Sequence, residues 1–434
     1  PSSGAPPRHS RWDGRTLTLD AKKNKGDMQP YLGNVNVRWG AFDLSDLSEM
    51  RFEPHEEERY SLLPGDLVVC EGGEPGRCAI WTGQVQRMKI QKALHRIRPK
   101  PSLDNYYLYY WFRHAANVGL LDAHFTGTTI KHLTGRAIAS LQVPLPPVET
   151  QRASVDVLRR LDDRIDLLRQ TNATLESIAQ ALFKSWFIDF DPVRAKAEGR
   201  EPEGMDAATA ALFPAEFEES ALGLIPKGWT YRPAEELFDV GIGKTPPRKE
   251  PHWFSEGSGD MRWLSIKDMG DEGTIASRSS EFLSSEAVTR FNVRVVPSRT
   301  VLMSFKLTVG RLSITDGPMC TNEAIAHFKA REGSPQFTYL YCYLKAFDFR
   351  TLGSTSSIAE ATNSKAVKAL PVLFPSSRLV DAFHRASAEM FEKMFVQKSH
   401  CRRLEELRDT LLPRLISGKL RLPEALEAAE AVAA

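Results

Sequence analysis

The chain has 434 residues, more than one ordinary domain, and 42% of them are hydrophobic and 26% charged, as in folded proteins with more than one core. Lys and Arg total 57 against 55 Asp and Glu, and the net charge of +2 excludes a polybasic tail protein and an acidic disordered chain. No long apolar run predicts a transmembrane helix, and the Pro- and Arg-rich start lacks the apolar segment of a secretory signal. The five cysteines form no CxxC pair. We therefore expect a cytoplasmic protein with reduced thiols and no membrane contact.

The first predicted element is a β-rich domain over residues 1–147. Short apolar runs at 66–70, 78–81 and 85–90 alternate with Gly and Pro, as strands alternate with turns. Pro147 marks the end of this domain, because proline is well tolerated only where a helix begins.

The next predicted element is a long helix over residues 148–190. From Leu158 onward the apolar residues are spaced alternately by three and four, which is the heptad pattern of a coiled-coil seam. Asn172 occupies the one polar seam position, where it would help to fix the register of two paired helices. A core helix of a globular bundle is the alternative interpretation. The other seam residues are Leu161, Ile165, Leu168, Leu175, Ala179, Leu182 and Trp186.

Four further segments follow this helix. Residues 191–226, where prolines recur and acids outnumber bases, predict a linker with a short helix at 207–212. Residues 227–376 predict a second β-rich domain, 377–420 a second long helix, and 421–434 a tail. The second helix keeps its apolar residues in the same heptad register, at Met390, Met394, Cys401, Leu404, Leu411 and Leu415.

The two halves of the chain repeat one pattern. Gly76 and Arg77, between two apolar runs, match Gly310 and Arg311 at an offset of 310 − 76 = 234, and further matches at offsets near 232 and 229 follow in the same order. This repeat predicts an α+β fold with two β-rich domains, separated by a pair of long antiparallel coiled-coil helices and related by an internal pseudo-twofold axis. Subtracting the offset from Lys227 gives a position before residue 1, so the first domain is expected to lack its opening strand or to begin differently.

Basic residues gather at the same place in each repeat. Residues 75–103 contain seven Lys and Arg and no acid, and residues 287–315 contain five and no acid. One such run is more often a solvated face, but its recurrence beside Gly-rich loops favours two phosphate-facing surfaces. For each single residue an ordinary hairpin turn is the alternative. The predicted DNA-binding residues are Arg77, Lys89, Lys92, Lys131, His132, Lys244, Arg248, Lys267, Lys306, Thr308, Arg311, Ser356 and Asn363.

The sequence contains no recognisable catalytic motif. Gly243, Lys244 and Thr245 resemble the end of a phosphate-binding loop, but Phe238 stands where that motif needs Gly and Pro246 where it needs a helix. No metal-binding spacing of Cys and His and no nucleophile–base pair stand out. We therefore expect a non-catalytic chain that binds no metal or cofactor itself.

Several segments resemble one known family. These are the proline-rich helix entry at 144–151, the helix end at 175–192, the domain opening at 227–229, the stretch 243–248 and the C-terminal helix at 404–419. Together with the repeat, they make the chain similar to the specificity subunit of a type I restriction-modification enzyme.

The resemblance implies a division of labour. Each β-rich domain would be a target recognition domain for one half of a split double-stranded DNA site, with the helices as a ruler between the halves. Two modification subunits would dock on the helices and methylate adenine with S-adenosylmethionine, and restriction subunits would add ATP- and Mg-dependent translocation and cleavage. A coiled-coil scaffold that binds only protein and a stand-alone restriction enzyme are the alternatives. The expected subunit interface consists of exposed apolar residues on the helices, namely Phe183, Trp186, Phe187, Phe190, Leu411 and Leu415.

Overall fold

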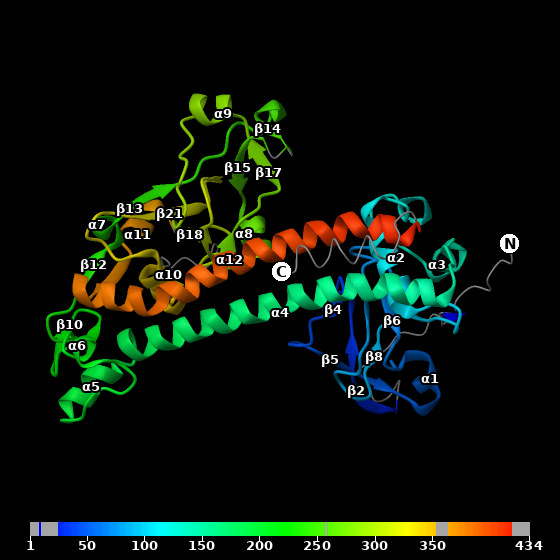
Figure 1. The fold of residues 1–434 in the computed structure, drawn as a ribbon, viewed down its shortest axis with the longest axis horizontal. Helices are drawn as coiled ribbons and strands as arrows, with labels where there is room; N and C mark the ends of the chain where they lie inside the picture. The colour runs from blue at the N-terminus through cyan, green and yellow to red at the C-terminus, as the bar shows by residue number, and fades with distance from the viewer. Residues whose placement is uncertain (1–7, 10–24, 256, 258, 353–362, 419–434) are drawn as a thin grey trace. The chain divides into compact units, whose positions relative to one another are not determined.

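The chain folds into two compact units in the computed structural model, which describes residues 8–9, 25–255, 257, 259–352 and 363–418 (Figure 1). The first unit comprises the described residues up to Ile165 together with those from Arg403 onward, and the second comprises Asp166–Arg402. No described helix is long and apolar enough to cross a lipid bilayer.

The first unit has two main sheets. One has the order β1-β9-β6-β7 and the other the order β5-β2-β8, and β3 and β4 form a separate antiparallel pair. The strands are β1 (Arg8–His9), β2 (Asp27–Leu32), β3 (Val37–Arg38), β4 (Ala41–Phe42), β5 (Ser48–Phe52), β6 (Leu67–Cys70), β7 (Cys78–Ile80), β8 (Lys89–Ile90) and β9 (Leu94–Arg98). The short helices are α1 (Glu57–Tyr60), α2 (Asn105–Asn117) and α3 (Gly135–Ser140).

The second unit repeats this arrangement with additions. Its sheets have the orders β13-β21-β18-β19-β16 and β14-β17-β15-β20, and β10–β11 and β12–β22 form two-stranded pairs. The strands are β10 (Phe217–Ser220), β11 (Gly223–Pro226), β12 (Thr230–Pro233), β13 (Phe238–Ile242), β14 (Phe254–Ser255), β15 (Met261–Leu264), β16 (Ile275–Ala276), β17 (Glu281–Leu283), β18 (Val301–Ser304), β19 (Leu312–Thr315), β20 (Cys320–Thr321), β21 (Ile325–Ala330) and β22 (Pro371–Phe374). The short helices are α5 (Asp191–Ala197), α6 (Ala207–Ala210), α7 (Ala234–Leu237), α8 (Ile266–Glu272), α9 (Ser285–Arg290), α10 (Phe337–Ala346) and α11 (Ser364–Lys368).

The strand pairing confirms the predicted duplication. Strands β2 and β8 are parallel with Leu32 opposite Ile90, and β15 and β20 are parallel with Leu264 opposite Thr321, at offsets of 264 − 32 = 232 and 321 − 90 = 231. The antiparallel hairpin β6–β7 corresponds in the same way to β18–β19. Among residues 25–147, the β12–β22 pair has no counterpart.

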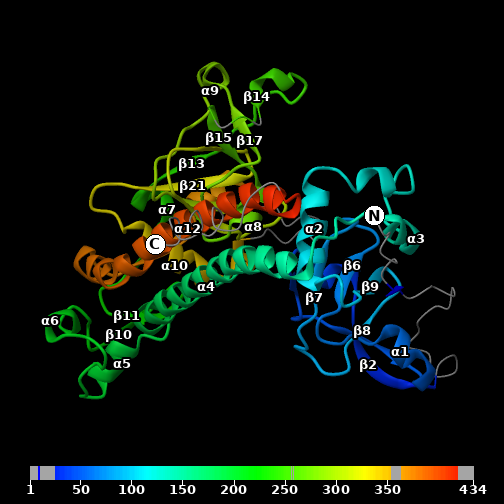
Figure 2. The same cartoon turned by 45° about the vertical axis from the view of Figure 1, so that its right-hand side comes forward.

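Two helices of 40 residues each, α4 (Val148–Phe187) and α12 (Ser377–Ile416), contribute to both units (Figures 1 and 2). Their heptad seams are confirmed, because seam residues such as Leu158, Ile165 and Leu404 are fully or almost fully buried. Both helices are shorter than predicted: α4 ends at Phe187 rather than at residue 190, and α12 ends at Ile416, while residues 419–434 lie outside the described residues.

The two helices are antiparallel. In the second unit the Asn172 Nδ2 atom donates to the Met394 carbonyl at 3.3 Å, and the Phe183 ring lies 5.6 Å from that of Phe383 in an edge-on contact. Residue numbers therefore rise along α4 as they fall along α12. Asn172 makes the polar seam contact predicted for it.

Residues 191–226 were expected to form a linker, but they fold onto the second unit. The buried residues Val193, Phe213 and Ile225 join its core, and the Phe213 ring packs edge-on against Trp186 at 5.3 Å. The composition was misleading because a few apolar residues between the acids and prolines suffice to bury this segment. The predicted short helix is present as α6 and ends at Ala210.

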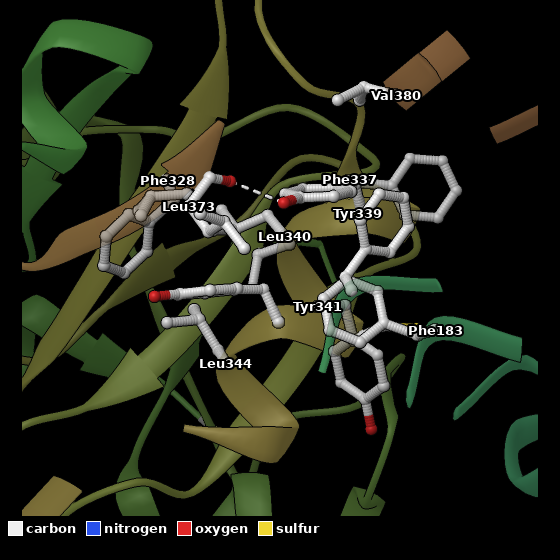
Figure 3. Packing of buried hydrophobic residues seen from close by; sticks show 14 of the residues in the cluster. Phe183, Phe328, Phe337, Tyr339, Leu340, Tyr341, Leu344, Leu373 and Val380 are labelled. Atoms are coloured by element: carbon white, nitrogen blue, oxygen red, sulfur yellow. Dashed lines mark hydrogen bonds between the residues drawn. The ribbon is translucent and has the colours of Figure 1, made fainter. Parts of the chain in front are cut away.

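The aromatic residues at the end of α4 lie inside the second unit. Phe183, Trp186 and Phe187 are at most 5% exposed. Tyr339 of α10 packs against Phe183 (Figure 3) and also against Phe187. Leu411 and Leu415 on α12 are also buried, and Phe190 packs partly buried against the same core. The prediction that these side chains are exposed for partner subunits is therefore wrong. The heptad pattern showed two paired helices and gave no sign of the third helix.

Candidate nucleic-acid interface

An arginine follows the loop of the central hairpin in each unit. In the β6–β7 hairpin, Gly76 has a φ of 92°, and the Arg77 Nη2 atom donates to the Asn34 carbonyl at 3.0 Å. Glycine adopts a positive φ without strain, so a glycine is favoured at this position of each hairpin loop. In the β18–β19 hairpin, Gly310 has a φ of 85°. The Arg311 Nη1 atom donates to the Ile266 carbonyl at 2.6 Å.

The loop of the first hairpin carries acids that neutralise its bases. Glu74 accepts a hydrogen bond from Arg77 Nη1 at 2.9 Å and another from the Trp39 indole at 2.6 Å. Glu71 lies 3.3 Å from His95 and 3.9 Å from His132, and the hydrogen bond with His95 lowers the pKa of Glu71. Arg77 and His132 are therefore engaged within the first unit.

The first basic window is mostly paired. Lys89 is buried and donates to the Glu57 carboxylate and the Ser61 hydroxyl, so the prediction that Lys89 contacts DNA is wrong. The hydrogen bonds that Glu57 accepts from Lys89, and then from Gln29 and Ser61, lower the pKa of Glu57 to about 2. Arg98 forms a two-pronged ion pair with the buried Asp66, both bonds at 2.7 Å. The partners lie outside the window, so counting charges along the chain could not show them.

The second basic window is paired in the same way. Arg290 lies near Glu286, Arg294 pairs with Asp239, and Arg299 binds both carboxylate oxygens of Glu392. Three of its five bases thus neutralise acids of the same unit. The two windows are therefore not bare phosphate-facing surfaces.

Exposed cations remain at a few predicted positions. Lys92 and Lys131 are exposed in the first unit, where the Lys131 Nζ atom lies 5.6 Å from the centre of the Phe125 ring. In the second unit Lys244 is exposed, and Lys267 is exposed but lies 3.7 Å from Asp271. These side chains can meet phosphates.

The loop after β13 presents an ordered arginine. Both Arg248 Nη atoms donate to Glu281, at 2.6 and 2.9 Å, and the guanidinium lies 4.1 Å from the centre of the Phe254 ring and 4.6 Å from that of Trp263. The hydrogen bond to Glu281 raises the pKa of Arg248. The Trp263 indole also donates to the Lys244 carbonyl at 3.1 Å, which fixes the loop that carries both cations.

The tip of the β18–β19 hairpin projects three residues. Lys306 and Thr308 are exposed, and Leu307 between them is 80% exposed with a φ of 64°. A left-handed backbone is costly for leucine and is tolerated mainly at functional sites. The sequence predicted contacts at Lys306 and Thr308 but not at Leu307, although an apolar residue between polar ones at a hairpin tip is a recognisable signal.

A cavity of about 470 Å³ lies beside this hairpin. It is lined by parts of α8 and α10, including Lys345 of α10, together with Arg311 and Phe349. Arg311 thus faces the cavity while its guanidinium holds the Ile266 carbonyl.

The remaining predicted contacts have other roles or cannot be placed. The Asn363 side chain caps α11 by accepting from the Ala366 amide at 2.8 Å. Ser356 lies outside the described residues. Within the described part of the chain, no group of three His, Cys, Asp or Glu side chains could hold a metal ion. All five cysteines are buried, and burial raises the pKa of Cys320 to about 12, which keeps this thiol protonated.

Comparison with known proteins places these features in a family. A family model for the "Type I restriction modification DNA specificity domain" matches residues 13–177 and 226–378. The chain is 30% identical over 333 residues to the type I restriction enzyme HindI specificity subunit of Haemophilus influenzae, covering 67% of this chain and 72% of that protein. It is 23% identical over 344 residues to the type I restriction enzyme MjaIX specificity subunit of Methanocaldococcus jannaschii, covering 78% and 74%. A crystal structure of a type I restriction-modification system S subunit from M. genitalium has the same fold, with a TM-score of 0.50, 14% identity and coverage of 94% and 92%.

Proposed function

This chain belongs to the type I restriction-modification DNA specificity family, and we propose that it selects the DNA site at which a methyltransferase and nuclease complex acts. The observation that carries this proposal is the duplicated domain. Each copy contains a matching hairpin whose loop ends in an arginine, Arg77 in the first and Arg311 in the second. Each β-rich domain is called a reading domain below, because it reads one half-site in this proposal. Two copies of such a domain in a single chain fit a target of two separate half-sites.

Different cations in each domain support the DNA contacts. In the second domain, Lys244 and Lys306 meet phosphates, while Leu307 and an Arg248 released from Glu281 face base edges, since an apolar tip suits the thymine methyl group and a guanidinium suits guanine. In the first domain, Lys92 and Lys131 contact the phosphates of the DNA backbone. DNA must replace Glu281 as the partner of Arg248 if that arginine is to read a base.

The paired helices α4 and α12 hold the two reading domains and receive the modification subunits. The surface for such a partner is not the buried aromatic cluster but the uncharged exposed face of α4. Leu167 is 53% and Ile178 48% exposed there, with Thr171 and Thr174 between them at heptad spacing. A partner helix with its own apolar stripe can complete this face.

Catalysis belongs to the partner subunits in this proposal. The modification subunits bind S-adenosylmethionine and methylate adenine, and restriction subunits bind ATP and Mg for translocation and cleavage. This chain supplies the choice of sequence and binds none of these cofactors.

The proposal is tested by expressing the chain with its modification subunit in a host that lacks other adenine methylation, and by sequencing methyladenine across the genome. We expect one bipartite motif with a fixed spacer, absent when this chain is omitted. Methylation by the modification subunit alone at the same motif would contradict the proposal. Methylation or cleavage by this chain alone would favour a stand-alone enzyme, and the absence of specific duplex binding even with the partner would favour a protein scaffold.

A further inference from the structure

A carboxylate of α4 is held by the reading domain of the second unit. The Tyr341 hydroxyl donates to Glu176 Oε1 at 2.7 Å, the Thr274 hydroxyl donates to Oε2 at 2.5 Å, and Lys345 Nζ lies 3.2 Å from Oε1. Tyr341 and Lys345 belong to α10, and Thr274 lies between α8 and β16. Glu176 therefore joins α4 to two separate segments of the domain.

A second carboxylate of α4 has the same kind of partners in the first unit. The Tyr110 hydroxyl, on α2, donates to Asp162 Oδ2 at 2.7 Å, and Arg408 Nη1, on α12, donates to Oδ1 at 2.7 Å. Arg113 of α2 lies 3.6 Å from the same carboxylate. Tyrosine, carboxylate and cation thus meet on α4 in both units, although Asp162 and Glu176 are not equivalent positions of the repeat.

Glu176 remains charged inside the protein. Burial alone would raise the pKa of Glu176, but the hydrogen bonds from Thr274 and Tyr341 and the charge of Lys345 lower it below its usual value. Burial, together with the charge of Glu176, raises the pKa of Tyr341, so its hydroxyl stays protonated as the donor. A partly buried ionic network of this kind is a weak source of stability compared with an apolar replacement, and its better-attested use is to specify one geometry.

The other contacts between α4 and the domain are mostly apolar, and they do not fix the orientation of the domain on the helix. Phe183 packs against Tyr339 and Tyr343 of α10, and apolar packing tolerates small shifts and rotations. Hydrogen bonds to two oxygens of one carboxylate fix distance and angle together. Rotation of the domain about α4 would break them first.

We propose that Glu176 and Asp162 are positioning residues, each of which fixes the orientation of one reading domain on its own stretch of α4, and that they thereby set the spacer length that the chain accepts. This inference rests on the proposed function, since it requires each domain to read one half-site. A change of orientation would displace a half-site along the DNA and leave the bases that are read unchanged.

The test uses the full chain in complex with its modification subunit. Methylation rates are measured on duplexes with the native half-sites and a spacer that is native, one base pair shorter or one base pair longer. For Glu176→Ala and Tyr341→Phe, we expect the ratio of off-length to native-length methylation to rise about tenfold, which corresponds to about 1.4 kcal/mol. Glu176→Gln, whose oxygen can still accept from Tyr341 and whose amide group can donate to the Thr274 hydroxyl, should stay close to wild type.

The control is Asp163→Asn, an exposed acid on the same helix, which should leave the ratio unchanged. An unchanged ratio in folded Glu176→Ala and Tyr341→Phe complexes would overturn the inference. Equal loss of methylation at all three spacers, in step with a lower melting temperature, would also overturn it, because the network would then serve stability alone. Failure of the wild-type complex to methylate any bipartite duplex would instead reject the proposed function on which the inference rests.

Discussion

Arg77 and Arg311 make the same hydrogen bond in the two units. Arg77 donates to the carbonyl of Asn34, which follows β2, and Arg311 donates to the carbonyl of Ile266, which follows the equivalent strand β15. The acceptors are separated by 266 − 34 = 232 residues and the donors by 311 − 77 = 234, so the bond spans equivalent places in both copies. Each arginine therefore ties its hairpin to the neighbouring sheet, and any effect on DNA binding acts through the position of that hairpin.

We expect Arg77→Ala and Arg311→Ala to reduce the free energy of unfolding by about 1 to 2 kcal/mol, because each leaves a backbone carbonyl without its charged donor. Each variant should also relax the sequence of one half-site and not the other, since each hairpin belongs to one reading domain. Urea unfolding and methyladenine sequencing measure the two effects. Arg160→Ala, which removes an exposed arginine of α4, is the control. Unchanged motifs in both variants would exclude these hairpins from recognition.

Leu307→Gly should separate stability from binding. Glycine adopts the φ of 64° at this tip without strain, so the free energy of unfolding is expected to stay the same or to rise. DNA affinity should fall about tenfold, or about 1.4 kcal/mol, if the leucine packs against a base. Fluorescence anisotropy with a duplex that contains the methylated motif gives the affinity. The same substitution at Leu145, which is 46% exposed in the first unit, should leave binding unchanged. Full affinity in Leu307→Gly would show that the tip does not touch DNA.

The sequence predicted the features that depend on local periodicity. The seam from Leu158 to Trp186 could be read from spacing alone, because each heptad position reports its own side of one helix. The duplication was visible because matching motifs keep their order. The seam is a property of neighbouring residues, and the duplication is a property of whole segments.

Contacts between distant residues could not be predicted in this way. Lys89 was expected on the surface because its window lacks acids, yet Glu57 lies 32 residues earlier in the chain and beside it in space. Phe183 was expected to be exposed because two paired helices alone would not cover it. The helix that does cover it, α10, lies more than 150 residues later in the chain. Charge and exposure depend on tertiary neighbours, so Lys89 and Phe183 were placed wrongly while the fold was confirmed.

Lys89→Met should destabilise the first unit by about 1 to 3 kcal/mol, because it breaks a buried ion pair whose carboxylate partner can still reach water. The pair also predicts an acid effect. Glu57 has a pKa of about 2 in the folded chain and an ordinary value near 4.5 when unfolded, so its stabilisation is complete above pH 4.5 and is lost as the pH falls toward 2. Urea unfolding at pH 7 and pH 3.5 should show a smaller pH-dependent loss in Lys89→Met than in wild type. An equal loss in both proteins would assign the acid sensitivity to other carboxylates.

His327 predicts a second pH dependence at milder acidity. It is fully buried on β21, its Nε2 atom lies 2.6 Å from the Thr321 hydroxyl, and burial followed by the nearby charge of Arg294 lowers its pKa to about 3. The unfolded chain protonates this histidine below pH 6.5 while the folded chain does not. Stability is therefore complete above pH 6.5 and falls as the pH drops toward 3, by about 1.4 kcal/mol per unit.

Urea unfolding at pH 6.5 and 5.5, where most carboxylates stay ionised, isolates this effect. Wild type should lose about 1 kcal/mol between the two values, and His327→Gln, which stays neutral and can still bond Thr321, should lose much less. His55→Gln, which removes an exposed histidine, should behave as wild type. If His327→Gln kept the full pH dependence, the proton taken up on unfolding would belong to another residue, and the buried histidine would have no part in the acid sensitivity of the second unit.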